Sequence, residues 1–495
     1  MSTTAQQDTG LIAATAQHVA EADAAIATLH GPTQGIAVHD PASGQLIAHV
    51  PDSTPEQAVA AARRADAAGT SWAEQSPRHR AQVLHNWYAL LIEHGERIAK
   101  LISREMGKPL AEARGEVKYG TDFVRWYAEE AVRPGGNFQP APDGGADILT
   151  RRAPVGLAVL ITPWNFPLAM ATRKIAPALA AGCPVLIKPA TATPLTTYYA
   201  VQLAIEAGVP EDLVQVVSTS DSAAFSTAVL SDPRVRKVSF TGSTPVGRTL
   251  LELASKNVLR SSMELGGNAP LLVFDDADFE RAIEGTIAAK LRNGGQSCIG
   301  ANRIYVQSGI ADEFAAELAR RFARIQVGAG LGEGTELGAL IDSRAVAQMQ
   351  GFTDDALERG AQLLAGGHGY PGTGHFYAPT VLDHVDPAAQ VSGQEIFGPI
   401  AAIRRFNTED EVLGWANDTE FGLAGYVFSQ DLDRALNVAD RLQTGIVGIN
   451  QGVPSNAAAP FGGVKQSGLG REGASEGLEE YQSIRFYNIS RRTTH

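Results

Sequence analysis

The spacing of apolar residues follows two different rhythms along the chain. Up to about Val132, apolar residues recur every three or four positions, which is the period of amphipathic helices. One helix is predicted to have Ser53 or Thr54 as its N-cap and to end at Gly69. The helical pattern that follows is interrupted at Gly107, so this region is expected to be a set of long helices.

A Pro- and Gly-rich connector, residues 135–147, leads into a different pattern. The segment "ILTRRAP" after it is predicted to be a short strand away from the core. The short apolar runs "GLAVLITP", "CPVLIKP", "LVQVVS" and "RKVSFTG" then alternate with helical segments. Strands that are apolar on both faces and alternate with helices are typical of a parallel, doubly wound sheet. A second alternation begins at Pro270, so the sequence predicts two α/β units.

Length and composition narrow the class of protein. With 495 residues, 44% of them hydrophobic and 19% charged, the chain is expected to form two or three globular domains. The net charge of −13 argues against a nucleic-acid partner, because phosphate backbones favour dense Lys and Arg patches. The apolar region 155–187 is broken by prolines and basic residues, so no membrane span is predicted. Two cysteines and a start without a leader pattern favour a cytoplasmic protein.

The stretch "FTGSTPVGRT", residues 240–249, differs from a phosphate-binding P-loop at one position. Gly242 and Gly247 have the P-loop spacing, but Arg248 stands where the lysine should be. A P-loop, an ordinary strand-to-helix turn and a dinucleotide phosphate site are all compatible with a strand, a Gly turn and a helix start. The usual G-x-G-x-x-G fingerprint is absent, since "GAGLGEG" from residue 328 has Glu333 in place of the last glycine and follows a helix.

Two cysteines stand in different surroundings. Cys298, in "NGGQSCIGANR", follows a helix that ends in glycines and has polar neighbours, which favours an accessible nucleophile over a buried structural thiol. Cys183, in "LAAGCPVLI", has the apolar neighbours of a structural cysteine. A papain-like pair is disfavoured because no histidine has a comparable Gly-rich context.

Three polar residues stand at predicted strand ends, where ligands of open α/β sheets gather. Glu264, in "SSMELGGNAP", is a candidate general base, or else a salt-bridged structural carboxylate. Asn165, in "ITPWNFP", is a candidate oxyanion donor, or else part of an Asx turn. Lys188, in "LIKPATATP", is a candidate ligand contact.

Seven segments connect these candidates: "ITPWNFP", "AAGCPVLIKPA", "FTGSTPVG", "MELGGNAP", "GGQSCIGANR", "QEIFGPI" and "APFGGVKQSGLGRE". In their order and spacing the chain resembles the aldehyde dehydrogenase superfamily from about residue 35 to 490, and it looks closest to succinate-semialdehyde dehydrogenases. The resemblance implies an α/β fold with three parts. These are an atypical Rossmann cofactor domain (1–135 and 157–264), an α/β catalytic domain (265–468) and a small β oligomerisation arm (136–156 and 469–495).

The resemblance also implies roles for the candidates. Cys298 would attack the aldehyde carbon, Asn165 and the Cys298 N–H would hold the oxyanion, and Glu264 would activate the water that hydrolyses the thioester. A thiolate suits this reaction because a thiohemiacetal oxyanion expels hydride far more readily than an aldehyde hydrate does. "FTGSTPVG" would be the pyrophosphate turn, and no metal is implied. The implied cofactor contacts are Thr162, Pro163, Trp164, Lys188, Thr191, Gly242, Ser243, Val246, Leu265, Glu395 and Phe397.

The same resemblance indicates the substrate and cofactor. Arg173, Arg292, Ser455 and Phe461 match the substrate site of succinate-semialdehyde dehydrogenases, where two guanidiniums grip a carboxylate. Succinate semialdehyde is therefore expected, with glutarate semialdehyde or a broader range of aliphatic and aromatic aldehydes as alternatives. Thr191 stands where NAD-selective members have a glutamate that would repel a 2′-phosphate, so the sequence favours NADP over NAD.

Two other kinds of relative are weighed against this interpretation. A reductase of acyl phosphates would need no water-activating base, and a structural, crystallin-like relative would need no intact Cys298, Glu264 and Asn165 set. The expected assembly is a homodimer or homotetramer.

Overall fold

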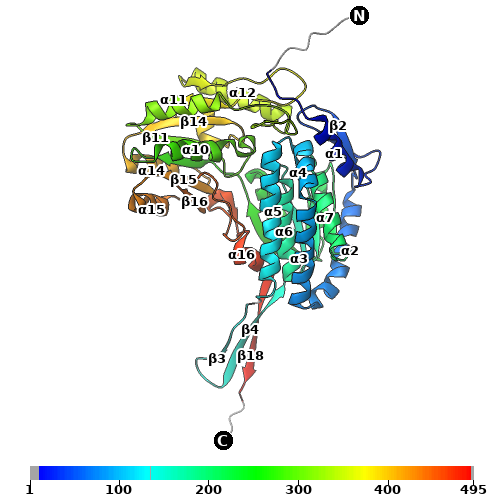
Figure 1. Ribbon diagram of the computed structural model, residues 1–495. Coiled ribbons are helices and arrows are strands. Elements are labelled where there is room, and N and C mark those ends of the chain that lie inside the picture. Colours follow the sequence, from blue (N-terminus) through cyan, green and yellow to red (C-terminus); the bar gives the residue numbers. More distant parts are fainter. Residues whose placement is uncertain (1–9, 134, 492–495) are drawn as a thin grey trace, which may run out of the picture.

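The computed structural model describes residues 10–133 and 135–491, which form two α/β units and a projecting arm (Figure 1). The first and last stretches of the predicted domains, residues 1–9 and 492–495, lie outside the described residues. We call the units the cofactor unit, the catalytic unit and the arm, after the predicted domains. The domain limits themselves stay a prediction.

Long helices form the first part of the cofactor unit, as the apolar period predicts. They are α1 (Ala16–Ala27), α2 (Pro55–Glu74), α3 (Pro77–Glu93), α4 (Gly95–Met106) and α5 (Leu110–Glu130), with the hairpin β1 (Ile36–His39) and β2 (Leu46–Val50) between the first two. Thr54 caps α2 in a capping box with Gln57, as predicted for one of its two candidate caps. The predicted end of α2 at Gly69 is wrong: a Cβ there would lie 2.6 Å from Pro184, so this glycine permits close packing inside the helix.

A six-stranded sheet completes the cofactor unit, in the order β17-β9-β8-β5-β6-β7. All neighbours are parallel except the short β17, so the predicted doubly wound sheet is confirmed. The order reverses between β5 and β8, which makes a topological switch point at the carboxyl ends of these two strands. The strands are β5 (Leu157–Ile161), β6 (Val185–Lys188), β7 (Val214–Val216), β8 (Val235–Thr241), β9 (Arg260–Glu264) and β17 (Gly468–Leu469), with helices α6 (Pro167–Ala181), α7 (Leu195–Glu206), α8 (Ser222–Leu230) and α9 (Thr244–Ser255).

Strand β5 shows why these runs are apolar throughout. Leu157, Val159 and Ile161 pack with residues of α2, α8 and α9 on one face of the sheet. Ala158 and Leu160 pack on the other face, against α3 to α7. Because helices cover both faces, alternation between apolar and polar residues is lost, and each large side chain that is buried contributes about 1.5–3 kcal/mol.

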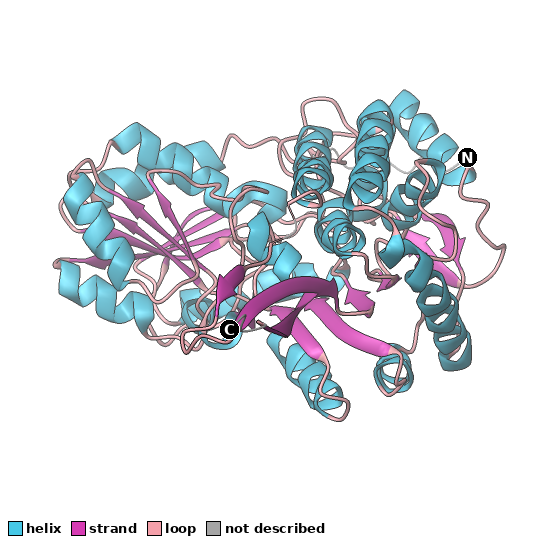
Figure 2. Cartoon of the chain, turned by 90° about the horizontal axis from the view of Figure 1, so that it is seen from below, coloured by secondary structure: helices cyan, strands magenta, loops and turns pink. Residues whose placement is uncertain are grey.

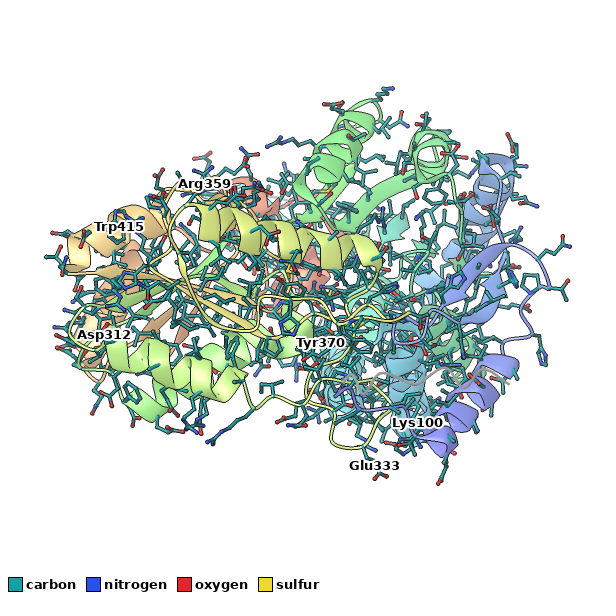
Figure 3. The ribbon with its side chains drawn as sticks, turned by 90° about the horizontal axis from the view of Figure 1, so that it is seen from above. Lys100, Asp312, Glu333, Arg359, Tyr370 and Trp415 are labelled. Carbon is teal, nitrogen blue, oxygen red and sulfur yellow. The ribbon has the colours of Figure 1, made fainter. Side chains whose placement is uncertain are left out.

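The catalytic unit is a second α/β layer structure with a seven-stranded sheet in the order β12-β13-β14-β11-β10-β15-β16. Seen from below, its strands fan out between helices (Figure 2). From above, Asp312 and Trp415 lie at one end of the molecule and Lys100 of α4 toward the other (Figure 3). Its elements are β10 (Ala269–Val273), α10 (Phe279–Leu291), η1 (Arg292–Gly295), β11 (Ala301–Gln307), α11 (Ala311–Phe322), α12 (Ser343–Glu358), β12 (Gln362–Ala365), β13 (Thr380–Asp383), α13 (Gln390–Gly393), β14 (Ile400–Phe406), α14 (Glu409–Asn417), β15 (Ala424–Phe428), α15 (Leu432–Arg441) and β16 (Ile446–Ile449).

The arm is a three-stranded antiparallel sheet that projects from the body (Figure 1). It consists of β3 (Phe138–Pro140), β4 (Ala146–Pro154) and β18 (Gln482–Ser490), so the strand predicted at "ILTRRAP" is longer than expected. Between η2 (Lys465–Ser467) and β18 the chain returns to the cofactor unit, where β17 pairs with β9 and α16 (Ala474–Glu479) packs on α5 and α6.

Candidate active site

One cavity of about 260 Å³ is lined by residues of both α/β units. It opens at the switch point of the cofactor sheet and at the loop that precedes β11. Fourteen of the sequence-predicted site residues line it: Pro163, Trp164, Asn165, Arg173, Gly242, Ser243, Glu264, Leu265, Arg292, Cys298, Glu395, Phe397, Ser455 and Phe461. Thr162, Lys188, Thr191 and Val246 do not line this cavity, although they belong to the same edge of the cofactor sheet or to the helix that follows it.

The candidate nucleophile lies in a tight loop between α10 and β11. Asn293, Gly294 and Gly295 all have positive φ, which turns the chain sharply before Cys298. Burial raises the pKa of the Cys298 thiol to about 12, with Arg173 opposing the shift and Glu395 and Glu264 adding to it. The chain alone therefore holds this sulfur as a thiol, and positive charge near it is needed to form a thiolate.

Two N–H groups beside the sulfur can hold an oxyanion. The Asn165 side chain is 4% exposed and donates one Nδ2–H to the carbonyl oxygen of Gln296 at 3.0 Å, which leaves the second N–H of that amide without a partner among the described residues. The backbone N–H of Cys298 donates to no acceptor in the described part of the chain. Donors that are already oriented stabilise developing negative charge without reorganising.

Glu264 ends β9 and presents a carboxyl group that is 2% exposed. Neither of its oxygens has a hydrogen-bond partner among the described residues. Burial first, and then repulsion by Glu472, raises the pKa of Glu264 well above its ordinary value, against the opposing effect of Arg173. A buried, unpartnered carboxyl group with a raised pKa has the properties of a general base that receives a water molecule.

The two candidate anion-binding arginines lie in different electrostatic surroundings. Arg173 is 1% exposed, and its Nε lies 2.5 Å from Glu472, which also pairs with Lys174. Arg292 has neither an ion pair nor a hydrogen bond among the described residues, and its guanidinium lies 5.0 Å from the ring centre of Phe166. Arg292 is therefore the side chain at this cavity with positive charge to offer a ligand.

The carboxyl ends of the strands in the cofactor sheet, which we call the cofactor edge, carry an unpaired lysine amine and the uncapped N-terminus of a helix. Lys188 ends β6 and is 6% exposed; its side-chain amine has no ion pair or hydrogen bond in the described chain, and burial lowers its pKa. Ser243 precedes α9 without a side-chain cap, so the first N–H groups of this helix are available. A Cβ at Gly247 would lie 2.5 Å from Leu265, so glycine lets α9 approach the sheet.

The P-loop alternative requires a cation at the turn of residues 240–249, and Arg248 does not supply one. Arg248 is directed to Glu420, at 3.3 Å, and to Gln466, so it neutralises a surface carboxylate instead of the turn. The glycine run that contains Glu333 packs on the N-terminal segment near Ile12, and Figure 3 shows Glu333 at the periphery.

Aromatic and acidic residues complete the lining of the cavity between the two units. The rings of Trp164 and Phe397 meet edge to face, with centroids 5.5 Å apart. Glu395 accepts a hydrogen bond from the backbone N–H of Gly267 at 3.1 Å, and burial raises its pKa to about 7. Thr162 donates its backbone N–H to the carbonyl of Lys188 at 3.1 Å, which joins the ends of β5 and β6.

Sequence reasoning missed several residues of this site. Tyr119, Phe166 and Met170 line the cavity, and Glu472 balances the charges of Arg173 and Lys174. Phe166 could have been found as the neighbour of Asn165, but Tyr119 and Glu472 come from distant helical and loop segments without a motif of their own. Within residues 10–133 and 135–491, no cluster of His, Cys, Asp and Glu could hold a metal ion, and no helix is long and apolar enough to cross a membrane.

The fold and the site define an α/β protein with a candidate cysteine nucleophile at the meeting point of two doubly wound units. The family model "Aldehyde dehydrogenase family" matches residues 29–487, and the chain belongs to this family. It is 50% identical over 445 residues to succinate-semialdehyde dehydrogenase of Paenarthrobacter nicotinovorans, covering 90% of this chain and 99% of that protein. It is 46% identical to the NADP(+) succinate-semialdehyde dehydrogenase GabD of Escherichia coli K12, covering 92% and 94%. The crystal structure of succinate-semialdehyde dehydrogenase from Burkholderia pseudomallei superposes with a TM-score of 0.91 at 45% identity, covering 92% and 95%. The predicted family and fold class are thereby confirmed.

Oxidation is expected to inactivate the protein at Cys298 alone. Two residues after Cys298 this chain has Gly300, so no neighbouring cysteine can form a local disulfide with it. Cys183 is fully buried in the cofactor unit and donates its thiol to the carbonyl of Tyr481, so it cannot reach Cys298 without unfolding. Peroxide treatment should give sulfenic acid or higher oxides of Cys298 by mass spectrometry. A Cys183–Cys298 disulfide in the folded protein would contradict this expectation.

Proposed function

We propose that the protein oxidises an aldehyde with a carboxylate at its far end to the dicarboxylic acid, namely succinate semialdehyde to succinate, with NADP or NAD as hydride acceptor. The observation that carries the proposal is one cavity that joins Cys298, the unpartnered Glu264 carboxyl group and the unpaired Arg292. The relatives named above are described as succinate-semialdehyde dehydrogenases. Glutarate semialdehyde, one methylene longer, is the first alternative.

In the first step, the Cys298 thiol releases its proton to solvent, the sulfur bonds to the aldehyde carbon, and the carbonyl oxygen becomes an oxyanion. Asn165 Nδ2 and the Cys298 backbone N–H donate to this oxyanion, which lowers the barrier to its formation. When bound, the nicotinamide cofactor supplies the acceptor for the hydride that leaves this carbon, which turns the adduct into a thioester. Arg292 holds the distant carboxylate, so the aldehyde carbon is fixed over the sulfur.

In the second step, Glu264 takes a proton from water, and the resulting hydroxide attacks the thioester carbon. The carbon–sulfur bond breaks, the acid leaves, and Cys298 regains its proton. Burial raises the pKa of Glu264, so its ionised fraction, and with it hydrolysis, rises with pH through that raised pKa. Glu472, held ionised by Arg173 and Lys174, keeps negative charge close to this base.

Glu264→Gln is the direct test of this two-step division. The variant should release about one equivalent of reduced cofactor per site in a rapid phase and then stall, because the thioester forms but water is not activated. Stopped-flow absorbance of reduced cofactor measures both phases, and mass spectrometry should find the acyl group on Cys298. Steady turnover at the unaltered rate would exclude Glu264 as the base.

The residues present fit a dinucleotide at the cofactor edge. The unpaired Lys188 amine, the uncapped start of α9 at Ser243 and the close packing at Gly247 are features that a ribose and a pyrophosphate use. We propose that Lys188 and Glu395 contact the riboses of the cofactor, that Thr191 lies at the adenosine ribose and Ser243 at the pyrophosphate, and that Phe397 packs on the nicotinamide. The other proposed contacts are Thr162, Pro163, Trp164, Gly242, Val246 and Leu265.

NADP is expected to be the preferred cofactor, because Thr191 is neutral where a carboxylate would repel the 2′-phosphate. Thr191→Glu should weaken NADP binding by about 10-fold or more and leave NAD binding within a few fold. Titration calorimetry and kcat/KM with each cofactor measure the effect. A kcat/KM for NAD ten or more times that for NADP in the unaltered protein would contradict the preference.

The alternatives of other classes meet specific obstacles. A reductase of acyl phosphates would leave the unpartnered Glu264 carboxyl group without a purpose. A structural relative without activity would not need two free N–H donors beside a half-buried thiol that lines a cavity. Measurable oxidation of any aldehyde, abolished by Cys298→Ser, separates the proposal from the structural alternative.

We further propose that the protein is cytoplasmic and assembles through the arm as a homodimer or homotetramer. The side chains of Phe138, Ile484 and Phe486 are 65%, 67% and 58% exposed on this sheet. An isolated, thin sheet with exposed apolar residues gains stability when another surface covers it.

A further inference from the structure

Asn293 lies five residues before the candidate nucleophile in an uncommon backbone conformation. Its φ of 59° and ψ of 34° are in the left-handed region, and its side chain is only 1% exposed. Residues other than glycine enter this region at a cost in free energy, and asparagine enters it more readily than most. The two residues that follow it are glycines with the same sign of φ, so only the first position of this turn has a side chain.

The Asn293 amide connects two backbone segments. Its Nδ2 donates to the carbonyl oxygen of Asn165 at 2.9 Å and to that of Gln296 at 3.0 Å. The Gln296 carbonyl also accepts the side-chain N–H of Asn165, at 3.0 Å. Asn165 follows β5 of the cofactor sheet, and Gln296 precedes β11 of the catalytic sheet. These bonds therefore join the two units at the point where the candidate oxyanion donor meets the nucleophile loop.

The orientation of this amide is fixed by its neighbours. Both groups that face Nδ2 are carbonyl acceptors, so the flipped amide would bring three oxygen atoms together. The backbone of Asn293 is held as well, because its N–H donates to both oxygens of Glu112 at 3.0 Å and its carbonyl accepts the N–H and Nε2 of Gln296. The Asn165 carbonyl receives a second donor from Lys108 Nζ, at 2.8 Å.

We propose that Asn293 is a positioning residue that keeps Asn165 and Cys298 in register, acting through the carbonyls of Asn165 and Gln296. The proposal rests on the roles given above to Asn165 and Cys298. Because the oxyanion donor and the sulfur come from different sheets, a small movement between the units would separate them. A misplacement of about 1 Å at a reacting group can lower the rate by about 100-fold. The Asn293 amide opposes that movement, although Asn293 itself does not line the cavity.

Two variants of Asn293 distinguish the effect of its side-chain amide from the effect of its left-handed backbone conformation. Asn293→Gly keeps the left-handed conformation without strain and removes only the two donated bonds. Asn293→Asp keeps the shape but places a carboxylate against the same two carbonyl oxygens. Asn450→Gly is the matched control: Asn450 also has positive φ (52°), also donates Nδ2 to a backbone carbonyl, that of Ser429 at 2.9 Å, and does not line the cavity.

The readout is the single-turnover rate of cofactor reduction, with enzyme in excess over aldehyde, together with the amplitude that counts competent sites. We expect the rate per competent site to fall about 10-fold in Asn293→Gly and about 100-fold in Asn293→Asp, with KM within about threefold of the unaltered value. Asn450→Gly should keep the full rate per competent site. A merely structural role for Asn293 would lower the thermal midpoint and the amplitude but leave that rate unchanged.

Single-turnover rates within about threefold of the unaltered protein in Asn293→Gly would overturn the proposal, and this variant decides if Asn293→Asp does not fold. An equal loss in Asn450→Gly would also overturn it, because the effect would then be general to the catalytic unit. Failure of the proposed function is a different result. Turnover by Cys298→Ser would remove the assumed nucleophile, whereas an inactive Cys298→Ser with fully active Asn293 variants would refute this inference alone.

Discussion

Cys298→Ser is expected to lower aldehyde oxidation by at least about 10³-fold, because an alkoxide is far harder to generate than a thiolate in the same cavity. Folding and cofactor binding should be unchanged, since the substitution is nearly isosteric and Cys298 has no hydrogen-bonded structural partner among the described residues. Initial rates with succinate semialdehyde measure the loss, and cofactor binding by calorimetry shows that the site is intact.

Cys183→Ser is the matched control for this variant. Cys183 is fully buried, burial raises its pKa to about 11, and its thiol donates to Tyr481 O, a bond that a hydroxyl can replace. This variant should therefore keep its turnover. Substantial steady turnover by Cys298→Ser would refute the mechanism, and a comparable loss in Cys183→Ser would show that the effect is not specific to the site.

Arg292→Ala is expected to lower kcat/KM for succinate semialdehyde by about 30- to 1,000-fold, mainly through KM. Charge-assisted hydrogen bonds from the guanidinium to the substrate carboxylate contribute about 2–4 kcal/mol of binding free energy. A neutral aldehyde of the same length does not form these bonds. Butanal should therefore be oxidised almost as before. The measurement is kcat/KM on a panel of ω-carboxylated, aliphatic and aromatic aldehydes with both cofactors.

Arg320→Ala is a suitable control, because Arg320 is an exposed arginine of α11 that pairs only with its neighbour Glu317. Equal efficiency with butanal and succinate semialdehyde in the unaltered protein would exclude the substrate, although the family would be unaffected. Arg173→Ala is a less specific test. Its loss would leave Glu472 and Glu264 with less positive charge, so hydrolysis of every thioester should change along with carboxylate binding.

The helices and sheets could be predicted because their signals are local. The period of apolar residues identified α3 to α5, Thr54 identified the start of α2, and four apolar runs identified β5 to β8. Gly69 was misinterpreted because a glycine that stops a helix and a glycine that permits contact with Pro184 look alike in sequence. The break between α3 and α4 at His94 was also missed, although Gly95 directly follows it, because the apolar period continues across this position.

Most of the candidate site followed from motifs, each of which lies at the end of a strand or in a glycine turn. The sequence by itself determined the doubly wound units, the family, and the chemical types of Cys298, Glu264 and Asn165. Only the tertiary structure decided their electrostatics: Glu472, about 300 residues from Arg173 in the chain, pairs with it, whereas Arg292 lines the cavity without an ion pair among the described residues. The same holds for Asn293, because its amide can bond the carbonyls of Asn165 and Gln296 only when the segment after β5 lies beside the segment before β11. Hydrogen bonds and charges act over a few ångströms in space, so residues that are remote in sequence set them, whereas periodicity and turn chemistry act between neighbours in the chain.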